Sequence, residues 1–449
     1  MDPAAPEDGG PPRSRLTRAA RLAALPAAHV GRSAMGLGKR LGGRPAELVA
    51  EQVQQRTAEQ LFATLGQLKG GAMKVGQAMS AMEAALPEHL VGPYREALTK
   101  LQESAPPMPA AMVHAQLDDA FPGGWREQLR GFDDRPVAAA SIGQVHRATW
   151  SDGTPVAVKI QYPGAGDALL ADLRLLQPLI PLIGAAAPGL DARSLVAELR
   201  DRLADEIDYT QEAAAQTAFA DAYRDDPDIC VPDVVAVEGP VLVTRWLDGV
   251  PLSLVITDGT PAERDRAGLL LVRLFASAPV RARRLHGGPH PGNFRLLPDG
   301  RLGVLDFGAT EHLPDGWPEG LGPLLAAGRD RDAAALHRIA VSAGLLQPGT
   351  VDPAAFLALL DPYLEPLRSP AYHFTRSWLR EQTRRASDPF SRTARTQRRL
   401  AIPPHHLLLQ RVASGLVGVL CSLDATVPVD GEVRRWLPGY DDPGASPPG

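Results

Sequence analysis

The chain is poor in cysteine and lysine, and it has no long hydrophobic run. Only Cys230 and Cys421 occur in 449 residues, so a disulfide framework is excluded and a reducing compartment is expected. The uncharged stretch 412–423 is too short for a membrane-spanning helix, which needs about 20 residues. The N-terminus lacks the basic start and apolar run of a secretory signal. We therefore expect a cytoplasmic protein that can make peripheral contact with the inner face of the membrane.

Acidic residues are absent between Pro11 and Ala46, although this stretch contains eight Lys or Arg residues. The net charge of the whole chain is -5, which does not indicate a nucleic-acid binder. The basic stretch has two interpretations, a solvated and disordered tail or a segment that contacts anionic lipid. Each cation near an anionic membrane surface contributes about 1 kcal/mol. Both interpretations remain open at this stage.

The order of patterns along the chain predicts an α+β, bilobal protein-kinase-like fold. A basic tail (1–45) precedes a helical N-terminal extension (46–130) that has apolar residues at helical spacing. A β-rich N-lobe with a helical insertion follows (131–250), then a helical C-lobe (251–440) and a short disordered tail (441–449). Within the N-lobe, the runs 145–150 and 155–162 flank an Asp-Gly turn and predict a β-hairpin. Residues 234–247 predict a second strand pair, and 294–297 and 302–306 predict short strands in the C-lobe.

Four residues in this order suggest an ATP site. Lys159 lies on a predicted strand and Glu212 on a later predicted helix, as in kinases, where a helical glutamate orients a lysine that contacts the α- and β-phosphates. Asp306 opens an Asp-Phe-Gly tripeptide at the end of a strand, where kinases place a magnesium-binding aspartate. Asn293 lies thirteen residues earlier, across one predicted hairpin, so both can reach the same metal ion. Each motif is weak alone, but their shared order makes chance an improbable explanation.

The histidines at 286 and 290 have the spacing of a helical zinc pair. Gly287, Gly288, Pro289 and Pro291 lie between or beside them and are incompatible with a helix, so a zinc site is not expected.

Further motifs narrow the kinase family. The sequence KVGQ spans residues 74–77, AAASIGQV spans 138–145, and EIDYTQEA spans 206–213. With the loop HGGPHPGNF (286–294) and the stretch 402–418, these motifs make the chain resemble the UbiB/ADCK (AarF-domain) family of atypical kinases. The resemblance covers residues 60–310 densely.

The resemblance implies a role for each matching position. Lys74 and Gln77 of the KxGQ motif would fold over the site as a gate, with Lys74 paired to Glu206 and Asp208. An alanine-rich nucleotide loop would comprise Ala138, Ala139, Ala140 and Ser141. The implied cofactors are ATP and Mg²⁺, and the implied partners are a nucleotide, proteins of a quinone pathway and anionic lipid, with no nucleic acid. The implied role is ATPase or phosphotransferase activity that supports isoprenoid quinone biosynthesis or membrane lipid homeostasis.

One departure from the family pattern weakens the catalytic part of this prediction. The family loop has an aspartate where this chain has Gly288, five residues before Asn293. Glycine can neither accept a proton nor orient a hydroxyl group, and general-base assistance is typically worth about 10²–10⁴ in rate. Two alternatives follow, an enzyme slowed by Gly288 and a pseudokinase scaffold that binds ATP. A small-molecule kinase of the aminoglycoside or choline type is a third, against which KVGQ and AAASIGQV argue. His290 is a weaker candidate for a substitute base.

Overall fold

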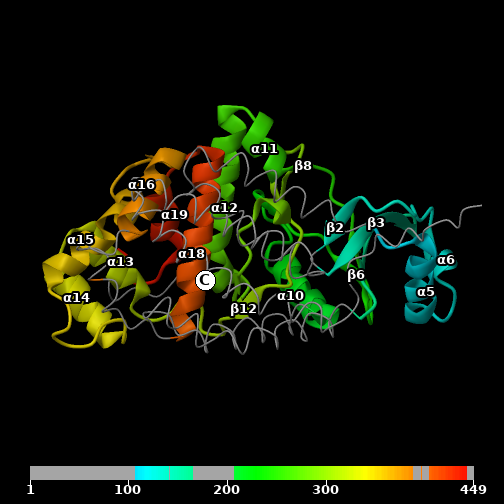
Figure 1. Cartoon of the computed structure of the whole chain (residues 1–449), viewed down its shortest axis with the longest axis horizontal. Helices are drawn as coiled ribbons and strands as arrows, with labels where there is room; N and C mark the ends of the chain where they lie inside the picture. The colour runs from blue at the N-terminus through cyan, green and yellow to red at the C-terminus, as the bar shows by residue number, and fades with distance from the viewer. Residues whose placement is uncertain (1–106, 141, 165–206, 388–395, 397–403, 442–449) are drawn as a thin grey trace, which may run out of the picture.

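The computed structural model describes residues 107–140, 142–164, 207–387, 396 and 404–441. Several predictions lie outside these residues: the basic tail, the KxGQ motif, most of the helical insertion and the C-terminal tail. The described chain has an antiparallel sheet at one end and helices at the other, with α12 and α18 side by side between them (Figure 1). This arrangement confirms the predicted α+β, bilobal kinase-like fold.

The small lobe is built on a six-stranded antiparallel sheet in the order β1-β3-β4-β7-β6, with β2 paired to β3. The hairpin predicted around the Asp-Gly turn is present as β3 and β4, with Gly153 at a φ of 92° in the turn. The strands of this sheet are β1 (Leu129–Arg130), β2 (Ala138–Ala140), β3 (Gly143–Trp150), β4 (Pro155–Gln161), β6 (Val234–Glu238) and β7 (Val241–Arg245).

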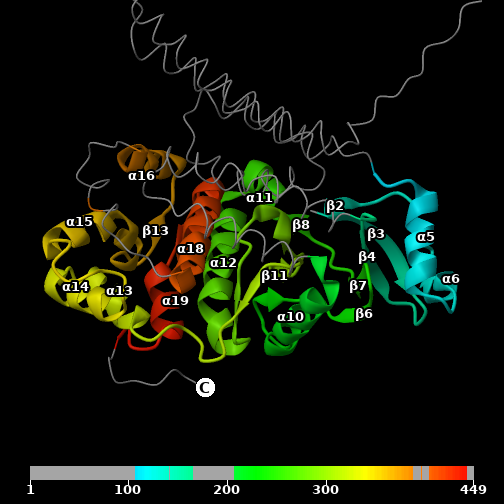
Figure 2. The same cartoon turned by 60° about the horizontal axis from the view of Figure 1, so that its bottom comes forward.

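Two short helices cover the outer face of this sheet, α5 (Ala110–Ala120) and α6 (Trp125–Gln128) (Figure 2). Val113 and Leu117 of α5 are fully buried against Val156, Val158 and Ile160 of β4. Because strand side chains alternate between faces, these three positions place Lys159 on the opposite face of β4. The core of the small lobe therefore fixes which way Lys159 points.

A buried hydrogen-bond chain joins the segment before α5 to the sheet. The Met108 amide donates to Gln144 Oε1 at 2.8 Å, and Gln144 Nε2 donates to His146 Nε2 at 2.8 Å. His146 Nδ1 then donates to the Asp133 carbonyl oxygen at 2.7 Å. These contacts fix both the amide orientation and the neutral tautomer of His146.

A second, four-stranded sheet belongs to the large lobe and runs β5-β11-β10-β8. The chain passes into it directly from β7, because β8 follows β7 after a short linker, residues 246–249. The strands are β5 (Ile229–Cys230), β8 (Val250–Pro251), β10 (Phe294–Leu296) and β11 (Leu302–Val304). Two further strand pairs were not predicted: β9 (Arg284–His286) with β12 (Thr310–His312), and β13 (Tyr372–His373) with β14 (Thr426–Val427).

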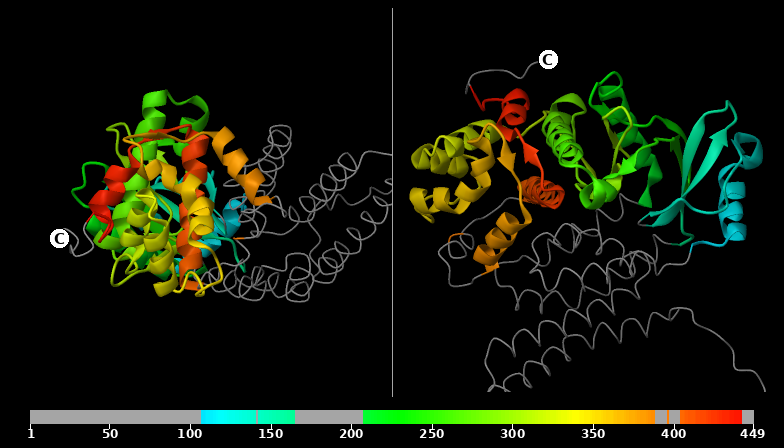
Figure 3. Two further views of the ribbon diagram at one scale, coloured as in Figure 1. Left: turned by 90° about the vertical axis from the view of Figure 1, so that its left-hand side faces the viewer. Right: turned by 90° about the horizontal axis from the view of Figure 1, so that it is seen from above.

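The long helix α12 (Pro261–Arg281) runs through the large lobe, and its apolar residues lie in the main hydrophobic cluster of the described residues (Figure 3). Its start is fixed by a capping box between Thr260 and Glu263, with Pro261 at the first helical position. Helix α10 (Tyr209–Ala222) packs against β6 and β7 of the small-lobe sheet. The remaining described helices, 3₁₀ turns included, are α11 (Leu252–Asp258), α13 (Leu321–Arg329), α14 (Ala333–Ser342), α15 (Pro353–Leu364), α16 (Arg376–Ser387), α18 (Pro404–Leu423), α19 (Val429–Trp436), η2 (Pro291–Asn293) and η3 (Glu365–Leu367). None of the described helices is both long enough and apolar enough to cross a membrane.

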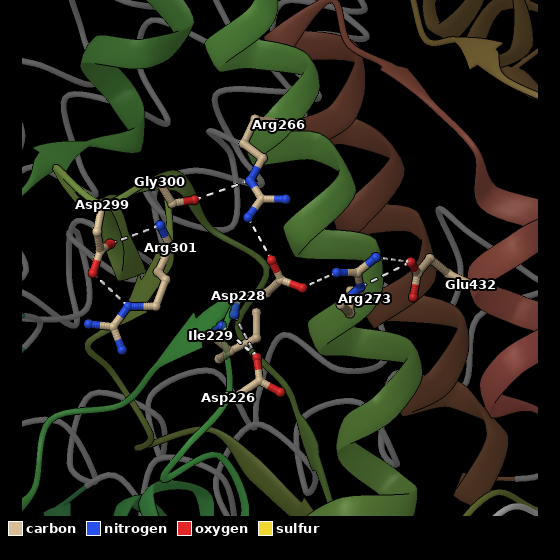
Figure 4. A network of polar contacts seen from close by, with 9 residues as sticks. All are labelled: Asp226, Asp228, Ile229, Arg266, Arg273, Asp299, Gly300, Arg301 and Glu432. Carbon is tan, nitrogen blue, oxygen red and sulfur yellow. Dashed lines mark hydrogen bonds and ion pairs between the residues drawn. The ribbon is translucent and has the colours of Figure 1, made fainter.

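An ion-pair network holds the loop after α10 to the large lobe. Figure 4 shows the carboxylate of Asp228 between the guanidinium groups of Arg266 and Arg273, both on α12. Arg273 also donates to Glu432 of α19 at 2.5 Å, and Arg266 Nε donates to the Gly300 carbonyl oxygen at 3.2 Å. The network thus anchors β5 and the β10–β11 hairpin beside it, and this hairpin carries the candidate site.

Candidate nucleotide site

Lys159 of β4 and Glu212 of α10 form a bidentate ion pair. Lys159 Nζ lies 2.6 Å from Glu212 Oε1 and 2.8 Å from Oε2. The Glu212 side chain is 2% exposed and the Lys159 side chain 20% exposed, so one partner is sealed and the other borders a cleft. The structure therefore brings together the lysine and glutamate that the sequence predicts as a pair.

Local sequence explains why Glu212 faces the sheet. The Asp208 side chain accepts a hydrogen bond from the Thr210 amide at 2.9 Å and begins α10 as its N-cap. Glu212 lies one turn later, on the face that also buries Tyr209, Ala213 and Gln216. The gate predicted for Asp208 requires Lys74, which lies outside the described residues, as do Gln77 and Glu206.

The charge state of the pair follows from its geometry. Burial lowers the pKa of Lys159, but the carboxylates of Glu212 and Asp306 outweigh burial and raise this pKa above its ordinary value. At this separation the lysine is charged, and its ammonium group also lies 5.0 Å from the centre of the Tyr209 ring. The site therefore presents the charged ammonium group of Lys159, which Glu212 holds in position.

Asn293 and Asp306 meet at the end of the β10–β11 hairpin. Phe294 pairs with Val304 in the antiparallel register, and the Leu305 amide donates to the Asn293 carbonyl oxygen at 2.9 Å. Asn293 Nδ2 donates to the Gly288 carbonyl oxygen at 3.0 Å, which leaves Oδ1 as its acceptor. Asp306 Oδ1 accepts from the Gly308 amide at 3.0 Å. Both side chains border the same cleft as Lys159.

These donors fit Mg²⁺, which prefers oxygen ligands and is commonly held by one or two protein groups plus phosphate oxygens and water. The orientation of the Asn293 amide is the observation that favours this fit, because its nitrogen is used on Gly288 and its oxygen is left over. Asn293 and Asp306 are the residues that would hold the ion. Within the described ranges, no group of three or more His, Cys, Asp or Glu residues is arranged so that it could hold a metal ion.

Gly288 lies directly beside Asn293. A Cβ atom at this position would come within 2.9 Å of Asn293 Nδ2, the end of a flexible side chain. The φ angle of Gly288 is not positive, so its backbone is open to other residues. An aspartate could therefore be accommodated by a small shift of the Asn293 amide.

His286 is a structural residue. It is fully buried, and its ring contacts Phe219, Phe275, Phe294 and Phe307 at centroid distances of 5.6–6.1 Å. Burial lowers the pKa of His286, and its Nε2 donates to the Asp306 carbonyl oxygen at 2.7 Å. The neutral ring thereby ties the loop of Gly288 to the strand end that carries Asp306.

His290 borders the cleft beside Asn293 and Asp306. Its Nδ1 accepts a hydrogen bond from the Gly292 amide at 3.1 Å, and burial lowers its pKa. The neutral ring consequently carries its proton on Nε2. In this conformation His290 is a hydrogen-bond donor, which is unfavourable for the role of substitute base.

The cleft itself has a volume of about 500 Å³. Ala138, Ala139 and Ala140 of the predicted nucleotide loop line it as strand β2, and Ser141 lies outside the described residues. Sequence reasoning missed the following residues of its wall: Gln216, Leu242, Thr244, Arg245, Trp246, Leu247, Pro251 and Arg295. The position of Arg295 could have been predicted from the alternation along its strand, since a cation between two apolar strand residues must face away from the core.

Comparison with known proteins decides the family. Residues 100–340, just over half of the chain, match the model of the ABC1 atypical kinase-like domain. The chain belongs to this family. The match confirms the resemblance to the UbiB/ADCK family that the motifs suggest, and it covers Lys159, Glu212, Gly288, Asn293 and Asp306.

Relatives of the ABC1 chain include mitochondrial atypical kinases. It is 33% identical over 293 residues to atypical kinase coq-8 of Caenorhabditis elegans, covering 63% of this chain and 38% of the relative. It is 29% identical over 328 residues to atypical kinase COQ8B of Danio rerio, covering 68% and 52% of the two chains. The match thus spans about half of these curated relatives or less.

A solved structure is similar over a larger share of the chain. The Rv3197–erythromycin complex from Mycobacterium tuberculosis superposes with a TM-score of 0.68 and 44% sequence identity. The similarity covers 89% of this chain and 100% of the other.

Proposed function

We propose that this ABC1-family chain binds Mg²⁺-ATP in the cleft between its two sheets. The observation that carries the proposal is the convergence of Lys159, held by Glu212, with Asn293 and Asp306 in one cleft. The Asp306 carboxylate and the Asn293 amide oxygen suit a metal–triphosphate, while the ammonium group of Lys159 suits phosphate oxygens. The nucleobase would then lie toward the linker between the sheets, residues 246–249.

The residues of the site have separate tasks in this proposal. Lys159 neutralises charge on the α- and β-phosphates, and Glu212 holds the ammonium group in place. Asn293 and Asp306 would hold the Mg²⁺ ion through an amide oxygen and a carboxylate. Mg²⁺, when bound, offsets negative charge on the phosphate oxygens. The proton of an attacking hydroxyl or water has no carboxylate acceptor at position 288.

The chain is therefore proposed to be a slow ATPase or phosphotransferase, because it lacks a general base at position 288. A pseudokinase scaffold, which binds ATP and switches conformation without turnover, is the second candidate, and Gly288 is the observation that favours it. The loss of general-base assistance lowers the rate by about 10²–10⁴. A sensitive ATPase assay can therefore distinguish slow turnover from none.

A thermal-shift titration with Mg²⁺-ATP tests the shared binding claim, because a ligand that binds the native state alone raises its melting temperature. We expect a concentration-dependent rise that disappears in Lys159→Met. A parent chain that shows no rise at millimolar Mg²⁺-ATP would refute the proposed function.

The biological role is proposed from the family resemblance, in support of isoprenoid quinone biosynthesis or membrane lipid homeostasis. Two parts of the chain outside the described residues belong to this proposal, the gate of Lys74 and Gln77 and the basic segment 13–44. Deleting residues 1–45 should weaken sedimentation with anionic liposomes at low salt. Equal sedimentation would remove the lipid contact without affecting the nucleotide site.

The complex of the M. tuberculosis protein suggests a macrolide as an additional ligand of this chain. The supporting observation is 44% identity over the full length of that protein. Erythromycin should raise the melting temperature of the chain in the same assay, and the absence of any rise would exclude the macrolide while leaving ATP untouched.

A further inference from the structure

The two walls of the cleft differ in chemistry at the end near the linker 246–249. The small-lobe sheet contributes the short apolar side chains of Val145 and Ala157, from β3 and β4. The large-lobe sheet contributes Pro251 and Leu305, and between them Arg295 of β10. A flat ring that enters this end would have methyl groups on one face and a guanidinium-bearing side chain on the other.

Strand alternation and one hydrogen bond fix the placement of Arg295. Its neighbours Phe294 and Leu296 are 0% and 8% exposed and belong to the large-lobe core, so Arg295 extends from the opposite face of β10. Arg295 Nη1 donates to the Gly249 carbonyl oxygen at 2.8 Å, at the end of the linker. This contact tethers the guanidinium group at the linker rather than at the phosphate end.

Arg295 is also partly desolvated, and burial lowers its pKa, although the group remains a cation. Its nearby carboxylate is Asp248, and no salt bridge to Arg295 is present in the described part of the chain. A half-buried guanidinium group that faces a cleft and has a single tether is well suited to an aromatic partner, since its planar face stacks on rings.

We propose that Arg295 forms the large-lobe face of the nucleobase subsite and stacks its guanidinium group on the purine of the nucleotide. This inference rests on the proposed ATP site and adds a residue that determines affinity for the base. Arg295 binds the base and takes no part in phosphate transfer. Because Arg295 is tethered at the linker, its planar face is offered to the base and not to the phosphates.

The test compares three variants of the full chain by calorimetric titration with Mg²⁺-ATP, with adenosine and with Mg²⁺-triphosphate. Arg295→Leu removes the guanidinium group. Arg295→Lys keeps a charged donor for the Gly249 carbonyl oxygen but lacks the planar group that stacks on a ring. Arg301→Leu is the matched control, because Arg301 lies on the same hairpin, pairs with Asp299 at 2.7 Å and does not line the cleft.

Arg295→Leu should weaken ATP and adenosine binding by the same factor, about tenfold. Arg295→Lys should lie between Arg295→Leu and the parent, and Arg301→Leu should match the parent. Triphosphate binding should not change in any variant. Weaker ATP binding with unchanged adenosine binding would overturn the stacking role in favour of a phosphate contact. Unchanged binding of ATP and adenosine in Arg295→Leu would also overturn the stacking role. In that case, ATP binding by the parent would still support the proposed function. A parent that does not bind ATP at all would refute both.

Discussion

Asn293 Nδ2 donates a hydrogen bond of 3.0 Å to the carbonyl oxygen of Gly288. The same nitrogen lies 2.9 Å from the point that a Cβ atom at 288 would occupy. The residue that would hold the metal ion is therefore oriented by the backbone of the residue that lacks a catalytic side chain. Nucleotide binding and proton transfer are separable in this site, because the backbone contact needs no side chain at 288.

Gly288→Asp should raise the ATPase rate of the chain tenfold or more. The new carboxylate would stand where kinases place the acceptor of the nucleophile's proton, and general-base assistance is typically worth about 10²–10⁴. Steady-state phosphate release measures the effect, with Gly288→Asn as a control of similar size that lacks the charge. An equal rate in all three proteins would show that the missing base does not limit turnover.

Lys159→Met should lower stability as well as nucleotide affinity. The substitution leaves the carboxylate of Glu212 buried without its cation, and breaking a buried ion pair from one side costs about 3–5 kcal/mol. The double variant Lys159→Met/Glu212→Gln should recover part of the free energy of unfolding but none of the ATP binding. Chemical denaturation and calorimetry measure the two quantities. Recovery of ATP binding in the double variant would contradict the role of Lys159.

Acidification should destabilise the small lobe through His146. Burial lowers its pKa in the folded state, so below the unfolded value of about 6.5 the unfolded chain binds a proton that the native chain resists. Stability is thus complete above that value and declines as the pH falls from it toward the folded pKa. The melting temperature should fall between pH 7.5 and 5.5, and less steeply in His146→Gln. His286 and His290 share this sign, so part of the slope should remain. Identical slopes in both proteins would exclude His146 as the source.

Gly415→Ala should disturb the loop that contains Gly288, although the two positions are far apart in the sequence. A Cβ atom at 415 would lie 2.6 Å from Pro289 Cγ, and one turn earlier Arg411 Nη2 donates to the Gly287 carbonyl oxygen at 3.3 Å. Overpacking costs about 1–3 kcal/mol, which exceeds the gain of up to about 1 kcal/mol in helix propensity. We expect a lower melting temperature together with weaker Mg²⁺-ATP binding.

Gly431→Ala is the control for that substitution. Gly431 lies in α19 with no atom within 4 Å of its added Cβ, so this change should be neutral or slightly stabilising. Equal effects of the two substitutions would mean that α18 does not position the loop.

Local sequence predicted the parts of the site that depend on local structure. Alternation in residues 155–162 placed Lys159 on a strand, and the spacing of Asn293 and Asp306 matched the β10–β11 hairpin that brings them together. Contacts set by tertiary packing were beyond sequence reasoning. The approach of α18 to Pro289, the bond from Met108 to Gln144 and the cleft position of Arg295 each depend on how separate elements pack. The proton on His290 Nε2 likewise follows from a backbone contact that no pattern reveals.

The affinities of the parent and of Gly288→Asp for Mg²⁺-ATP, measured side by side by isothermal titration, test whether nucleotide binding is independent of the side chain at position 288. We expect micromolar dissociation constants that agree within a fewfold, because the proposed nucleotide ligands Lys159, Asn293 and Asp306 are present in both proteins. Binding that appears only in Gly288→Asp, or in neither protein, would contradict this expectation.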